Sequence, residues 1–282
     1  MKIKNLIIVL FMSIAAMSCT ERIDIDLDNQ KYARLVVEGA LSTDTTVHAI
    51  KLTKTADYFD NQPPEAVSEA SVIIASDEDE YQLTESPVGS GIYLTAPDVY
   101  GKIGKTYETR ILLKEKIGGF DEYTASGKIY PIYPIDSIAL EFKPEWGDAG
   151  FWEVKCYVLD PPTEDFYMFQ VFRNDVLVTD SINEIFVTDD VLYNGNYTNG
   201  IGVGYLNQAR DDQKLVPGDQ VTLKISRITK EYTNFVMQVQ TEISYQSPLF
   251  SGPPANVQGN IDNGAFGFFA SYSCAYSSVM AE

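Results

Sequence analysis

A lipid attached to the thiol of Cys19 is the clearest chemistry that the sequence offers. Lys2 and Lys4 open the chain, and an uncharged apolar run follows from Leu6 to Met12. A basic start, a short apolar stretch and small residues before a cut site are typical of an export signal. The apolar run is too short to cross a bilayer, which takes about 20 apolar residues.

Ser18 before Cys19 resembles the bacterial lipobox, in which the cysteine is diacylated and becomes the first residue of the mature chain. Ala16 stands where this motif usually has leucine. The alternative is ordinary secretion with a free Cys19. We expect a signal peptide of residues 1–18 and acylation of Cys19, by palmitate or similar chains. More than one acyl chain gives stable membrane anchoring.

Two further cysteines lie on predicted strands. Alternation in residues 151–158 places Cys156 on an apolar face, and alternation in residues 266–274 does the same for Cys274. An exported compartment permits disulfides. A Cys156–Cys274 bond would stabilise the fold by about 4–5 kcal/mol in the chain-entropy model. Two separate buried thiols explain the pattern equally well, so both alternatives stay open.

His48 is the only histidine, so a Ser–His–Asp or Cys–His mechanism would have to use it. No Gly-x-Ser-x-Gly motif is present, and we interpret His48 as a strand or edge residue. One histidine and two buried cysteines do not supply a transition-metal site. No phosphate loop or dinucleotide fingerprint occurs. We therefore expect no catalytic residue, metal or cofactor, although 40 acids leave a paired-carboxylate hydrolase and a calcium site open.

The chain is strongly acidic, and this argues against nucleic acid as a partner. Its net charge is −19, and removal of residues 1–18 takes away two lysines and no acid, which gives −21. Phosphate binding needs a basic surface. Residues 19–31 contain several acids and resemble the acidic tether of surface-exposed lipoproteins in Bacteroidota. A solvated linker is the simpler interpretation of this segment, and the two are compatible.

Short alternating segments separated by turn residues predict an all-β protein. We expect two β-sandwich domains: residues 32–127, immunoglobulin-like, and residues 137–282, which carry one helix. A segment with Pro131 and Pro134, residues 128–136, would link them. The predicted strands are 34–41, 47–55, 70–76, 80–85, 91–95, 106–114, 137–143, 151–159, 167–172, 176–180, 220–227 and 266–277.

Residues 228–245 have the apolar period of an amphipathic helix, which we expect to cover an open face of the second sheet. Ser226 or Thr229 can cap its start. Residues 189–206 are rich in Tyr, Asn and Gly and predict a loop. Its tyrosines Tyr193, Tyr197 and Tyr205 make it a candidate ligand- or partner-binding loop, and a plain surface loop is the alternative.

Three short motifs resemble the Bacteroidota O-glycosylation pattern of Asp, Ser or Thr, and then a small or apolar residue. The candidate acceptors are Thr45, Ser137 and Ser181. Each motif is weak by itself, and their number in one exported chain gives modest support.

Several segments occur in an order that resembles a Bacteroidota lipoprotein family known only as a domain of unknown function, the 4249 type. They are the anchor segment, Gly91-Ile92-Tyr93, the two-proline segment with Ile135-Asp136-Ser137, the helix, and the tail Pro253-Pro254-Ala255-Asn256 with Gly264-Ala265-Phe266-Gly267. The resemblance covers nearly the whole mature chain, and the tail is its most specific part. It carries no catalytic residues.

The resemblance implies an accessory subunit for nutrient import. Such proteins tend to be encoded beside a TonB-dependent barrel and its substrate-binding lipoprotein. We therefore expect a non-enzymatic lipoprotein, anchored in the outer membrane at the cell surface, that helps these two partners import peptide or glycan. The alternative is a stand-alone glycan- or peptide-binding surface lipoprotein that uses Tyr193–Tyr205. A carboxylate-dependent hydrolase is the third hypothesis.

Overall fold

The computed structural model describes residues 33–56, 62–244 and 257–282, which belong to one compact unit. These residues contain fifteen strands and one helix. The bounds are β1 Leu35–Ser42, β2 Ala49–Lys54, β3 Ser71–Ala75, β4 Glu80–Glu85, β5 Ile92–Leu94, β6 Thr106–Ile117, β7 Phe120–Lys128, β8 Ser137–Lys143, β9 Phe151–Tyr157, β10 Phe166–Arg173, β11 Val176–Leu177, β12 Phe186–Asp189, β13 Ile201–Asn207, β14 Gln220–Ile228, α3 Lys230–Ile243 and β15 Phe266–Met280.

Buried and exposed side chains alternate along many of these strands, as the sequence pattern predicted. The all-β prediction is confirmed. In β6, Tyr107, Thr109 and Ile111 are buried, and the residues between them are exposed. An antiparallel strand with one face on a core and one face in water has this pattern. None of the helices in the described residues is long and apolar enough to cross a membrane.

Two separate apolar cores lie along the chain. The first is built mainly from β1–β7, with Leu35, Ile74 and Ile111 among its fully buried residues. The second lies between β8–β9–β13 and β10–β14–β15, and it includes Val154 and Leu223. The predicted division into two sandwich domains stays a prediction.

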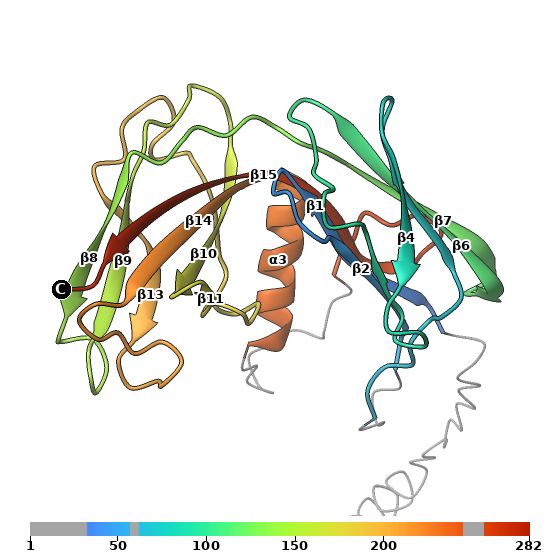
Figure 1. The fold of residues 1–282 in the computed structure, drawn as a ribbon, viewed down its shortest axis with the longest axis horizontal. Helices are drawn as coiled ribbons and strands as arrows, with labels where there is room; N and C mark the ends of the chain where they lie inside the picture. The colour runs from blue at the N-terminus through green and yellow to red at the C-terminus, as the bar shows by residue number, and fades with distance from the viewer. Residues whose placement is uncertain (1–32, 57–61, 245–256) are drawn as a thin grey trace, which may run out of the picture. The chain divides into compact units, whose positions relative to one another are not determined.

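The last strand, β15, takes part in both halves of the large sheet. Its first half pairs in parallel with β1, and its second half pairs antiparallel with β14. Figure 1 shows this long strand running from β1 and β2 to β14. Phe269 of β15 belongs to the first core, and Ala275 and Val279 pack on the second. The C-terminal strand therefore completes a core formed mostly by the N-terminal residues.

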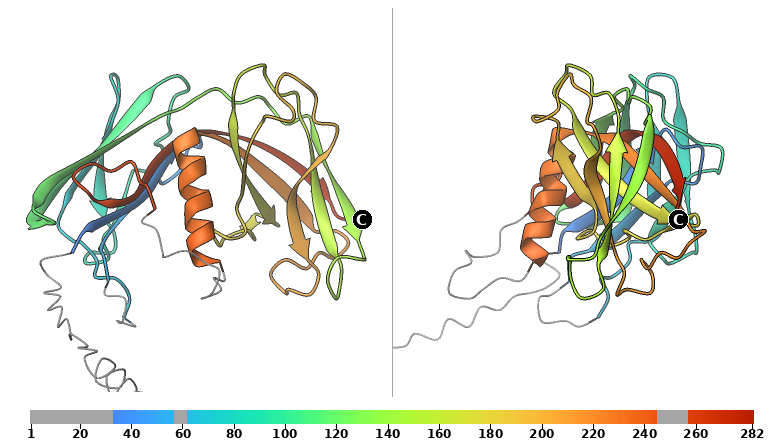
Figure 2. Two further views of the ribbon diagram at one scale, coloured as in Figure 1. Left: turned by 180° about the vertical axis from the view of Figure 1, so that it is seen from behind. Right: turned by 90° about the vertical axis from the view of Figure 1, so that its left-hand side faces the viewer.

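The predicted helix is confirmed as α3, which begins two residues later and ends two residues earlier than expected. Thr229 caps it by accepting a hydrogen bond from the backbone N–H of Tyr232 at 3.2 Å. Its apolar stripe packs against residues of β10, β12 and β15, including Met168, Val187 and Tyr272. Figures 1 and 2 show the helix beside these strands. It covers one face of the sheet, as the sequence predicted.

Three strands were not predicted. β7 follows β6 through Gly118 and Gly119, which both have positive φ. β12 is only four residues long, and β13 occupies residues that the sequence assigned to a loop. The segment between β7 and β8 has no regular structure, as its two prolines predicted. Residues 1–32, with Cys19 and the tether, and Pro253–Asn256 of the tail lie outside the described residues.

Candidate functional site

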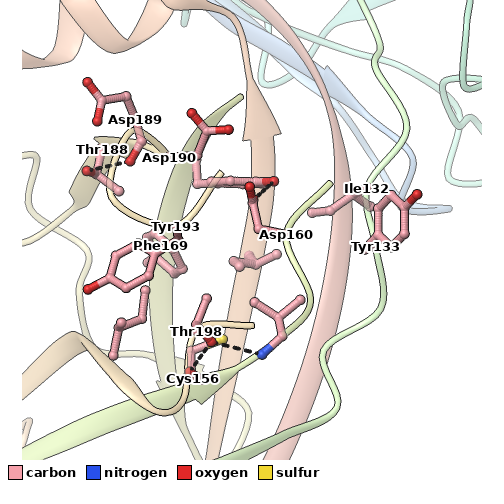
Figure 3. Close-up of a pocket in the computed structure, with 14 residues that line it drawn as sticks. Ile132, Tyr133, Cys156, Asp160, Phe169, Thr188, Asp189, Asp190, Tyr193 and Thr198 are labelled. Carbon is pink, nitrogen blue, oxygen red and sulfur yellow. Dashed lines mark hydrogen bonds between the residues drawn. The ribbon is translucent and has the colours of Figure 1, made fainter. Parts of the chain in front are cut away.

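A small cavity lies in the second half of the chain, between the ends of several strands. Its walls include Cys156 of β9, Tyr167 and Phe169 of β10, and Tyr193 from the loop after β12 (Figure 3). Its volume is about 30 Å³. That is room for one or two water molecules or an ion and too small for a sugar ring or a peptide.

Three buried aspartates meet at one side of this cavity. Asp160 follows β9, Asp165 directly precedes β10, and Asp190 directly follows β12. They are 5%, 0% and 3% exposed, and one carboxylate oxygen from each lies within 4.8 Å of the others. We call these three residues the acidic cluster.

Backbone hydrogen bonds hold the acidic cluster in place. The N–H of Asp190 donates to the carbonyl oxygen of Asp165 at 3.1 Å, and the N–H of Asp160 donates to that of Asn196 at 3.0 Å. Pro161 and Pro162 follow Asp160 a few residues after the end of β9. The strand does not continue through them, because proline has no backbone N–H to donate to a neighbouring strand. The chain thus brings together the ends of three strands, each with one acid.

The three carboxylates differ in how many ion-pair and hydrogen-bond partners they have. Asp165 forms an ion pair with Arg227 of β14, whose side chain is 11% exposed, and it accepts from Thr163 at 3.0 and 3.1 Å. Asp160 accepts from the Tyr167 hydroxyl at 2.7 Å through Oδ1. Oδ2 of Asp160 and both oxygens of Asp190 are buried with no hydrogen-bond partner. Three acids and one guanidinium leave a net charge of −2 in the cluster.

Burial dominates the electrostatics of the site. Burial, followed by the neighbouring carboxylate of Asp160, raises the pKa of Asp190 to about 6. Burial and the hydrogen bond to Asp160 also raise the pKa of the Tyr167 hydroxyl, and burial lowers the pKa of Arg227. The unpartnered oxygens of Asp160 and Asp190 need a proton or a cation beside them.

Several residues next in sequence to the cavity lining have large exposed apolar side chains. Val191 and Leu192 lie between Asp190 and Tyr193 and are 71% and 82% exposed. Leu159, next to Asp160, is half exposed and forms a β-bridge with Tyr197. Together with Tyr133, which lines the cavity, these residues form what we call the apolar rim: Tyr133, Leu159, Val191, Leu192 and Tyr197. A group of large exposed apolar residues of this kind is typical of a contact surface.

The candidate tyrosines are divided between two places. Tyr193 lines the cavity and Tyr197 belongs to the apolar rim. Tyr205 lies instead on β13, where its ring packs against that of Trp146 at an interplanar angle of 54°, with the ring centroids 5.6 Å apart. The loop prediction is correct for residues 190–200 and wrong for residues 201–206, which pair with β9 as part of β13.

The two cysteines do not form the disulfide that the sequence left open, and both are free thiols. Cys156 points into the second core, and burial raises the pKa of its thiol to about 12. Cys274 alternates along β15 with Ala275, which packs on that core, so Cys274 faces the opposite side of the sheet. There its sulfur lies 3.6 Å from Oγ of Ser226.

The remaining candidate residues lie away from the cavity. His48 is buried just before β2, and its Nε2 lies 3.2 Å from the carbonyl oxygens of Asp44 and Val99. This arrangement fits a structural strand-edge residue. Thr45, Ser137 and Ser181 are all exposed, so each hydroxyl is accessible to a glycosyltransferase.

Sequence reasoning missed the acidic cluster. Asp160-Pro161-Pro162 ends a predicted strand, and Asp189-Asp190 begins the tyrosine-rich loop, so both were visible as turn residues. Nothing in the spacing shows that they meet, because Asp190 reaches Asp165 only through the pairing of β12 with β10, and Asp160 follows β9 of the other sheet. Arg227, near the end of β14, was the one further sign in the sequence of a buried acid nearby.

Comparison with known families gives one match. The family described as a domain of unknown function (DUF4249) matches residues 20–277. Comparison with the curated proteins found no match.

Proposed function

The chain belongs to the family of this domain of unknown function, and from that premise we propose that it is a non-enzymatic accessory lipoprotein of an outer-membrane import complex. Its lipid at Cys19 would hold it in the outer membrane at the cell surface. Its partners would be a TonB-dependent barrel and the substrate-binding lipoprotein of that barrel. The cargo class would be peptide or glycan.

The apolar rim is the observation that carries this proposal. Val191 and Leu192 expose two consecutive large apolar side chains in a loop whose base is fixed by buried contacts of Asp190 and Tyr193. Such residues are the usual energetic centre of a protein–protein contact. The body is acidic and Asp189 beside the rim is exposed, so the complementary partner surface is apolar with basic residues around it.

The acidic cluster is a weak basis for the hydrolase hypothesis. Its carboxylates are at most 5% exposed, so a glycan does not reach two of them together. A pair of glycosidase carboxylates must flank the scissile bond. The cluster therefore favours a role in stability or ion binding over a role in turnover.

A stand-alone glycan-binding lipoprotein is the second candidate function. Trp146, between β8 and β9, and Tyr205 of β13 are 39% and 41% exposed, and their tilted rings contact each other. Flat exposed aromatic side chains suit the apolar faces of sugars. Binding of a soluble polysaccharide by the isolated protein, lost in Trp146→Ala and Tyr205→Ala, would favour this function. Loss in Tyr193→Ala and Tyr197→Ala would place the glycan at the loop instead.

Affinity purification of the full chain from gently solubilised native membranes tests the leading function. We expect a barrel and a second lipoprotein to co-purify. Val191→Ser with Leu192→Ser should lower their recovery roughly tenfold or more, because such contacts contribute about 1 kcal/mol or more each. Val88→Ser, at a site 89% exposed in the turn between β4 and β5, is the matched control and should change nothing. Purification of the chain alone would contradict the proposal.

A further inference from the structure

We propose that the acidic cluster, Asp160, Asp165 and Asp190, binds one hard divalent cation, with Ca²⁺ the best fit. This inference does not depend on the proposed function. The sequence led us to expect no metal, because that expectation considered only histidine and cysteine ligands and continuous acidic motifs.

Unpartnered oxygens are the first observation that points to an ion. Both carboxylate oxygens of Asp190 and Oδ2 of Asp160 are buried without a hydrogen-bond donor, although Asp190 is only 3% exposed. Buried polar groups in folded proteins almost always have a partner. An ion between Asp160 and Asp190 would supply a partner to three oxygens at once.

The charge and the donor type identify the class of ion. Arg227 offsets one of the three carboxylates, and the remaining charge of −2 matches a divalent cation. All the donors are oxygen atoms, which calcium and magnesium prefer and which copper, zinc and iron sites rarely use alone. Cys156 also lines the cavity, but its soft sulfur donor does not suit a hard cation such as calcium or magnesium.

The irregular donor set fits calcium better than magnesium. The three carboxylates offer oxygens close enough to bind one ion, and calcium accepts about six to eight oxygen ligands in a flexible geometry. Magnesium needs about 2.0–2.1 Å and a near-ideal octahedron. The cavity beside Asp160 and Asp190 holds one or two waters, which can complete the coordination of an ion that has only three carboxylates.

An ion at this site would join three segments of the chain. It would link the ends of β9 and β12 to the start of β10, and so fix the loop that carries Val191 and Leu192. The apolar rim would then be ordered by calcium. Extracellular calcium modules have dissociation constants of about 10⁻⁴–10⁻³ M, and we expect this range for the acidic cluster.

Calorimetric titration of the chelator-treated full chain with CaCl₂ tests the proposal. We expect one ion per chain. At a tenfold excess over the dissociation constant, Ca²⁺ should raise Tm by roughly 2–4 °C. MgCl₂ should bind more weakly. Tb³⁺, a calcium probe, should show tyrosine-sensitised luminescence that Ca²⁺ displaces, because the Tyr167 hydroxyl contacts Asp160.

Asp190→Asn separates ion binding from folding. The variant removes a buried charge and keeps the shape, so its Tm without calcium should equal or exceed that of the natural chain. Its affinity for Ca²⁺ should fall roughly tenfold or more, and the Tb³⁺ signal should disappear. Asp148→Asn, at an exposed acid, is the control and should bind normally. Absence of Ca²⁺ and Mg²⁺ binding at about 5 mM, well above the expected range, or unchanged binding in Asp190→Asn, would overturn the proposal.

Discussion

Gly267→Ala is expected to destabilise the protein by about 3 kcal/mol or more. Gly267 has a φ of +93° and pairs with Val37 of β1. A Cβ atom there would lie 1.9 Å from the carbonyl oxygen of Val37. The left-handed backbone alone costs about 1–2 kcal/mol for alanine, and β1 cannot move away because it also pairs with β2. Urea unfolding of both proteins measures the difference.

Gly218→Ala is the matched control for this substitution. Gly218 has the same φ of +93°, and a Cβ atom there would meet nothing within 4 Å. It should therefore cost only the backbone strain of about 1–2 kcal/mol. Equal losses in the two variants would show that the close approach of β15 to β1 does not exist. This contact also explains the need for glycine at Gly267, the last residue of the Gly-x-Phe-Gly part of the tail.

Arg227→Met is expected to cost about 3–5 kcal/mol of the free energy of unfolding. Its guanidinium pairs with the fully buried Asp165, donates to the carbonyl oxygen of Pro131 at 3.1 Å and lies 5.3 Å from the ring centre of Tyr130. In the calcium-free protein, removal of this guanidinium would leave three buried carboxylates without an offsetting charge. It would also release the irregular segment before β8 from the sheet. Chemical denaturation measures the loss.

Two further variants make this prediction specific. Arg110→Met removes an arginine whose ion pair with Glu108 is about half exposed, so it should change stability by no more than about 0.5–1 kcal/mol. Asp165→Asn in the Arg227→Met background should restore part of the loss, because it removes the unpaired charge. A loss below about 1 kcal/mol in Arg227→Met would contradict the importance of the pair.

Local patterns predicted the elements that have a single buried face. The apolar stripe of α3 could be identified because it repeats over three or more helical turns. The alternation of β6 could be identified because it repeats over three or more pairs of residues. The turn between β10 and β11 has Asn174 and Asp175 at positive φ, a conformation that these two residue types tolerate. By contrast, β7 was missed because several of its outward residues are charged, and β13 was missed because its sequence is rich in glycine.

Long-range pairing was the part that the sequence could not predict. β15 joins β1 across more than 200 residues, and no local pattern specifies a parallel partner. Cys274 illustrates the consequence. Its alternation was correctly identified, but the face that it shares packs against α3 and not against the core of Cys156. The acidic cluster depends on the same kind of contact, because Asp165 and Asp190 meet through the pairing of β10 with β12, and Asp160 reaches them from β9 of the other sheet.

Mass spectrometry of the N-terminal peptide from native membranes tests the account most directly, since the proposed location and partners both depend on how the chain is attached. The predicted result is a peptide that begins at Cys19 and carries the added mass of acyl chains on its sulfur. A peptide with an unmodified Cys19, or a native chain that still begins at Met1, would contradict the proposal of a lipid-anchored import accessory.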